Sequence, residues 1–173
     1  MFEFELPNPL HPAIVHFPIV LTLLGTVLAL LSIITRRLWL PQYAALILVL
    51  ATIGAQVAVI TGDAQDQLFS TLTTEQKNLV ETHSDMGENG RTALIVAAAL
   101  ALIALALHRF GATRRVFALL TTLAGCVACF FVLRAAQLGG HLVFQHGIGG
   151  QREPAAAASP SPAESPAVSP NAQ

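Results

Sequence analysis

The sequence predicts an all-α protein, a four-helix transmembrane bundle with both termini in the periplasm and a disordered C-terminal tail rich in Pro, Ala and Ser. Hydrophobic residues make up 54% of the 173 residues and charged residues only 11%, whereas soluble domains carry about 25% charged residues. Long apolar runs divide the chain. These observations exclude an ordinary soluble enzyme and favour a small integral membrane protein embedded in a lipid bilayer.

The four predicted spans are apolar runs, at about residues 13–35, 40–61, 92–107 and 116–138. About 20 apolar residues are needed to cross, because a helix rises about 1.5 Å per residue and the hydrocarbon core is about 30 Å thick. The third run is shorter, but polar residues before it can continue its helix outward. Thr73 and Gln76 fit a capping box, so we expect a helix to begin there and to run through His83 into the third span.

A proline interrupts the start of the first span. Pro18 has no amide hydrogen and leaves the carbonyl of Ile14 without its helical partner. We therefore expect the first turns of this helix to be kinked or loosened.

The chain divides into one transmembrane domain, residues 1–150, and a tail, residues 151–173. The tail consists mainly of Pro, Ala and Ser. Such a segment cannot bury enough apolar surface to offset the entropy lost on ordering it. We therefore expect it to be disordered.

Arginine residues predict the orientation, because short loops that carry Lys and Arg remain in the cytoplasm. The two short turns between spans carry five of them: Arg36, Arg37, Arg109, Arg114 and Arg115. All ten acidic residues then lie on the other side. This arrangement predicts a bacterial inner-membrane protein with both termini in the periplasm. The net charge of −1 and the single Lys also exclude a broad basic surface for nucleic acid.

Five of the six histidines are expected at the periplasmic face: His11, His16, His83, His141 and His146. Only His108 lies at the cytoplasmic end. Neutral imidazole is the commonest metal ligand and also an axial ligand of haem, and helix bundles place such sites between facing helices. The clustering therefore predicts a cofactor site in this layer.

The leading hypothesis is haem b bound by two axial histidines from different helices. His16 and His83 rank first as ligands and His146 next, with His11 as a capping or supporting residue. Arg91 and Arg134 are candidates to pair with the propionates, because Arg binds carboxylates through two hydrogen bonds. A redox role would make a quinone or a periplasmic electron carrier the natural partner.

Two other functions are also consistent with the sequence. One is a metal site that shares these histidines, and the other requires no cofactor site. A copper or zinc ion would be held by three histidines and one carboxylate: His16, His83, His146 and Asp63. Alternatively, the chain is an accessory membrane subunit without a cofactor, whose histidines only form interfacial hydrogen bonds. The sequence has no Cys-x-x-Cys-His segment, which excludes covalently attached haem. Neither the ligand pair nor the oligomeric state follows from the sequence.

Three motifs carry a resemblance to a known family: HPAIVHFPI at residues 11–19, TGD at 61–63 and GGHLVFQHG at 139–147. Over about residues 8–150 the chain resembles domain of unknown function 2231, a small bacterial membrane domain with four spans. The family pattern is matched at His11, His16, Asp63, His83 and His146, whereas His141 falls where variation is expected. Some relatives are fused to haem or iron–sulfur domains, so the resemblance implies an association with redox proteins. Otherwise it implies fold and topology rather than a reaction.

Overall fold

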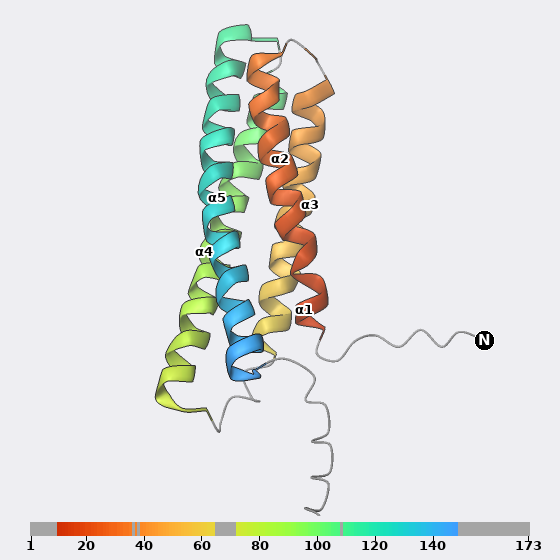
Figure 1. The fold of residues 1–173 in the computed structure, drawn as a ribbon. Helices are drawn as coiled ribbons and strands as arrows, with labels where there is room; N and C mark the ends of the chain where they lie inside the picture. The colour runs from red at the N-terminus through yellow and green to blue at the C-terminus, as the bar shows by residue number, and fades with distance from the viewer. Residues whose placement is uncertain (1–9, 36, 38, 65–71, 108, 149–173) are drawn as a thin grey trace, which may run out of the picture.

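The computed structural model describes residues 10–35, 37, 39–64, 72–107 and 109–148, and within them the secondary structure is entirely helical. The helices are α1 (His11–Ile14), α2 (His16–Ile34), α3 (Trp39–Asp63), α4 (Thr74–Ala106) and α5 (Gly111–His146). They form an antiparallel bundle, with α2 packed along α3 and α4 along α5 (Figure 1). The all-α, four-span prediction is thus confirmed. The predicted tail and His108 lie outside the described residues.

The first span shows the predicted loosening before Pro18. The helix is interrupted at Val15, between α1 and α2. Val15 nevertheless keeps helical dihedral angles, φ −59° and ψ −26°, so α1 and α2 continue in one direction. The missing amide of Pro18 explains the interruption, because the carbonyl of Ile14 has no helical donor four residues later.

The capping box at the start of α4 is also confirmed. The Gln76 amide donates to the Thr73 hydroxyl oxygen at 3.3 Å, and the Thr73 amide donates to Gln76 Oε1 at 3.0 Å. From there α4 runs for 33 residues and α5 for 36. At about 1.5 Å per residue both helices are about 50 Å long, so each extends about 20 Å beyond a hydrocarbon core of about 30 Å.

Small side chains form the interior of the bundle. Its core consists of Ala45, Leu48, Ala51, Ala55, Leu94, Ala97, Ala98, Ala101 and Ala128. Large apolar side chains point outward instead, as at Ile34 and Phe130, which are 70% and 59% exposed. Lipid tails solvate such side chains, and small residues let the helices approach closely. All four long helical segments are long and apolar enough to cross a membrane.

The chain direction places the two described chain ends on one side. The start of α1 and the end of α5 lie at the lower end of the bundle in Figure 1, whereas the end of α2, the start of α3, the end of α4 and the start of α5 lie at the upper end. We call these the histidine end and the arginine end, after His11, His83 and His146 at the first and Arg37, Arg109, Arg114 and Arg115 at the second.

Candidate functional site

The histidine end brings two imidazole rings together. His11 from α1 and His83 from α4 have ring centroids 6.1 Å apart, with the rings edge to face at 89°. Both side chains are partly buried. The two residues belong to different helices, so an ion held by both rings would link α1 to α4.

His11 is held by α3. Its Nδ1 lies 2.8 Å from the carbonyl oxygen of Ala58 and 3.3 Å from Oγ1 of Thr61. A carbonyl oxygen can only accept a hydrogen bond, so Nδ1 must carry the proton and donate. The ring rests against Gly62, where a Cβ atom would stand only 3.3 Å from Cε1 of His11.

His83 is held by α5 in the same manner. Its Nδ1 donates to the carbonyl oxygen of Ala135 at 2.9 Å. The ring rests against Gly139, where a Cβ atom would stand 3.1 Å from Cε1 of His83. We call Ala58 with Gly62, and Ala135 with Gly139, the two seats. Each seat is an Ala-x-x-x-Gly segment whose alanine carbonyl accepts from the imidazole and whose glycine makes room for it.

The seats decide which nitrogen of each ring is available. A neutral imidazole that donates from Nδ1 keeps a lone pair on Nε2. Metal-binding histidines commonly donate their other ring N–H to a backbone carbonyl or carboxylate, which fixes the tautomer and the ring orientation. His11 and His83 therefore offer two oriented Nε2 donors.

The other predicted ligands lie apart from this pair. His16 is exposed, as is His141, and His146 is half-buried at the last residue of α5. The structure thus pairs His83 with His11, which sequence reasoning had assigned only a capping or supporting role, and not with His16. The N-terminus of α1 has no side-chain cap.

Of the predicted charged partners, Asp63 lies near the pair, since it follows Gly62 and its charge acts on His11, whereas no contact of Arg91 or Arg134 with the two rings is described. Asp63 is exposed at the end of α3. Arg134 is exposed and donates from Nη1 to Oε1 of Gln137 at 2.6 Å, while Arg91 is half-buried. Among the described residues, no three His, Cys, Asp or Glu side chains form a group that could hold a metal ion. The site is therefore a two-histidine site in the part of the chain that the structure describes.

Sequence reasoning missed the two seats. Their signal is the spacing Ala58–Gly62 and Ala135–Gly139 near the outer ends of the second and fourth spans. Small residues four apart let another helix, or a ring, approach the backbone.

Comparison with known proteins identifies a family. The family model described as predicted membrane protein, DUF2231, matches residues 7–152. No curated protein and no solved structure matches the chain.

Proposed function

The chain belongs to the DUF2231 family of predicted membrane proteins, and we propose that this integral membrane protein binds a copper ion between the Nε2 atoms of His11 and His83. The observation that carries the proposal is the pair of seats. Both Nδ1 atoms donate to backbone carbonyls, at 2.8 Å and 2.9 Å, so both Nε2 lone pairs are available to a metal.

The number of donors favours copper over zinc. Cuprous ion is satisfied by two nitrogen donors in a line, and imidazole is a ligand that copper accepts well. A protein zinc site uses at least three side-chain ligands and in structural sites four. Zinc would therefore have to recruit further ligands, such as Asp63 at the exposed end of α3.

The separation of the rings fits a metal between them. Two metal–nitrogen bonds of about 2 Å and two half-rings of about 1 Å give centroids about 6 Å apart when both Nε2 atoms face the metal. The observed separation is 6.1 Å.

The same separation supports haem b as a second candidate, with His11 and His83 as its axial ligands. Haem makes a larger demand on space, because the macrocycle extends on all sides of the iron. Gly87, one turn from His83 in α4, leaves open space, since no atom lies within 4 Å of a Cβ built there. The rings themselves already lie against backbone at Gly62 and Gly139, which favours a bare ion.

Either centre would give the protein a redox role at the histidine end. We infer that this end faces the periplasm of a bacterial inner membrane, as the distribution of arginines predicts. A membrane quinone or a periplasmic electron carrier is then the natural electron partner.

Copper titration of the purified protein tests the proposal. Cuprous ion is added under anaerobic conditions in competition with a chromogenic chelator of known affinity. We expect about one ion per chain. In His11→Asn and His83→Asn the amide nitrogen occupies the place of Nδ1 and keeps the bond to the seat, but the ligand Nε2 is lost. Each variant should bind copper more than about tenfold more weakly.

His16→Asn is the matched control, because His16 is an exposed histidine on the next helical segment. It should bind copper as the unaltered protein does. Equal affinity in all four proteins, or equal loss in His16→Asn, would overturn the copper assignment. A Soret band in the purified protein that disappears in His11→Asn and His83→Asn would instead assign the pair to haem.

A further inference from the structure

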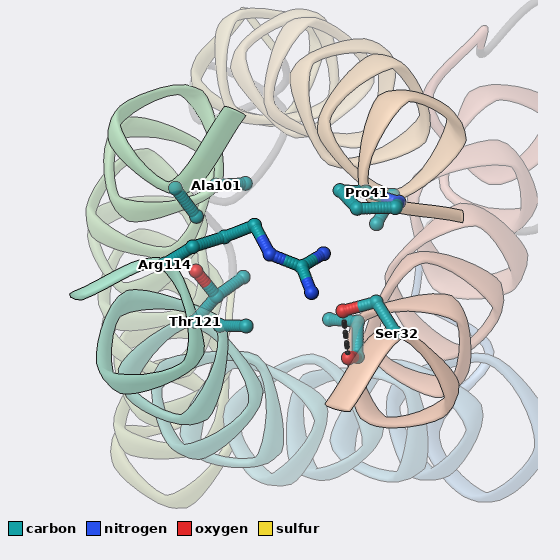
Figure 2. A pocket seen from close by; sticks show the side chains of 9 residues that line it. Ser32, Pro41, Ala101, Arg114 and Thr121 are labelled. Atoms are coloured by element: carbon teal, nitrogen blue, oxygen red, sulfur yellow. Dashed lines mark hydrogen bonds between the residues drawn. The ribbon is translucent and has the colours of Figure 1, made fainter. Parts of the chain in front are cut away.

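The arginine end of the bundle contains a hollow to which α2, α3, α4 and α5 all contribute residues. Figure 2 shows Ser32, Pro41, Ala101, Arg114 and Thr121 around it, with the guanidinium of Arg114 reaching into the middle. The enclosed space of the hollow is about 10 Å³, about the room that one water molecule needs, and the larger volume of about 280 Å³ around it includes open solvent. Each contributing residue lies within about three turns of a helix end, so the hollow lies in the part of the bundle nearest the arginine end.

Arg114 has no carboxylate partner among the described residues. The acidic residues that the structure describes are Asp63, Glu75, Glu81, Asp85 and Glu88, all at or toward the histidine end. Glu88 lies thirteen residues before Ala101 on α4, which is about 20 Å along the helix. A half-buried guanidinium without a carboxylate nearby is a site for an external anion.

The surroundings of Arg114 add positive potential, and the hydroxyl hydrogens that line the hollow are already engaged. Ser32 and Thr121 donate their hydroxyl hydrogens to carbonyls of their own helices, at 2.7 Å and 2.8 Å. Most other lining residues are alanines, whose methyl groups offer the guanidinium no hydrogen-bond acceptor. Arg37, Arg109 and Arg115 are exposed at the same end and raise the local concentration of anions.

We propose that Arg114 binds a phosphate group at the open mouth of this hollow, because the enclosed space itself is too small for one. The planar guanidinium fork matches two phosphate oxygens at once. Basic pockets between membrane helices on the cytoplasmic side recognise anionic lipid headgroups. The phosphate belongs either to an anionic phospholipid of the adjacent leaflet or to free inorganic phosphate. This site is separate from the histidine pair and does not depend on it.

A binding experiment distinguishes the two sources. Purified protein in detergent is titrated with short-chain phosphatidylglycerol, with inorganic phosphate, or with sodium chloride at matched ionic strength. The fluorescence of Trp39, the single Trp of the chain and two residues from Pro41 at the hollow, reports binding. Saturable binding of phosphatidylglycerol alone assigns the site to lipid. Saturable binding of inorganic phosphate as well assigns it to the phosphate group itself.

Neighbouring arginines provide the variants and the control. Arg114→Gln should weaken binding by about tenfold or more, the loss expected for a charge-assisted pair of hydrogen bonds. Arg114→Lys keeps the charge but loses the planar fork of two hydrogen-bond donors. Its affinity should lie between those of the unaltered protein and Arg114→Gln. Arg115→Gln removes the same charge from an exposed side chain and should change affinity less than twofold. Absence of saturable binding, or equal losses in Arg114→Gln and Arg115→Gln, would overturn the proposal.

Discussion

At the level of single side chains, helical geometry determines which histidine enters the pair. His11 and His16 are five residues apart, and at about 100° per residue they point about 140° apart. Only one of them can face the interior. Thr22, Gly25, Thr26, Ala29 and Ser32 are the buried small residues of α2. His11 lies seven residues before the buried Pro18. Seven residues make nearly two full turns of a helix, so His11 is on the same face.

The periodicity of these small residues therefore favours His11 as the histidine that faces the bundle. The prediction of His16 as a ligand rests instead on its depth along the first span. The role of His83 was easier to predict, because the capping box at Thr73 fixes the helix that carries it. The hydrogen bonds to Ala58 and Ala135 could not be predicted, since they depend on how closely α1 approaches α3 and α4 approaches α5.

The seat at Gly139 gives a test with an adjacent control. Gly139→Ala places a Cβ atom 3.1 Å from Cε1 of His83, whereas at Gly140 a Cβ atom meets nothing within 4 Å. Both changes replace a helical glycine by alanine and share the gain in helix propensity, about 1 kcal/mol. We expect Gly139→Ala to shift the His83 ring and weaken copper binding by about tenfold. Gly140→Ala should keep the affinity, measured by the same chelator competition. Equal copper affinities in the two variants would show that the seat does not orient His83.

At the level of helices, glycines determine how closely the spans pack. A Cβ atom at Gly25 of α2 would lie 2.8 Å from Cγ of Leu48 in α3, and one at Gly125 of α5 would lie 2.5 Å from Oγ1 of Thr26 in α2. Side chains of one helix thus pack directly against the backbone of the other at these glycines, as small residues allow in membranes. The apolar runs predicted the spans, because hydropathy is a property of each segment alone. The close contacts involve two segments and were not predicted.

Gly125→Ala tests the close approach of α5 to α2. The added methyl collides with Thr26, whose hydroxyl is fixed by donation to the Thr22 carbonyl at 2.8 Å. We expect the free energy of unfolding to fall by about 1–3 kcal/mol, the usual effect of overpacking. The double variant Gly125→Ala/Thr26→Ala should recover part of this loss, because Oγ1 and Cγ2 of Thr26 are removed.

Gly87→Ala is the control for the single and the double variant at Gly125, since a Cβ atom at Gly87 meets no atom within 4 Å. Its free energy of unfolding should be unchanged or higher. Denaturant unfolding in mixed micelles measures all four proteins. An effect of Gly125→Ala no larger than that of Gly87→Ala would contradict the packing described between α2 and α5.

For the molecule as a whole, the arginines predict the orientation in the bilayer and the aromatic residues mark one membrane surface. The arginine end also carries Trp39 and Tyr43, whose rings meet edge to face with centroids 5.8 Å apart. Trp and Tyr are enriched where the bilayer meets water, so this pair marks one membrane surface. The number of spans and their antiparallel order were predicted from hydropathy.

Thiol labelling in intact cells tests the orientation. In a variant with Cys126 and Cys129 replaced by Ala, a single cysteine is introduced by Gln42→Cys at the arginine end or by Asn78→Cys at the histidine end. Both positions are exposed. A membrane-impermeant reagent should modify the second variant and spare the first until the cells are opened. The opposite pattern of labelling would place the histidine end in the cytoplasm.

The two seats also make the site modular. His11 and its seat at Ala58 both lie before the α3–α4 connection, and His83 and its seat at Ala135 both lie after it. Each half of the chain therefore orients its own imidazole, and association of the halves creates the pair. Two separately synthesised fragments, cut between α3 and α4, should each lack copper binding and regain it on reconstitution in one bilayer. In this molecule, assembly of two helical hairpins and formation of the candidate metal centre are the same event.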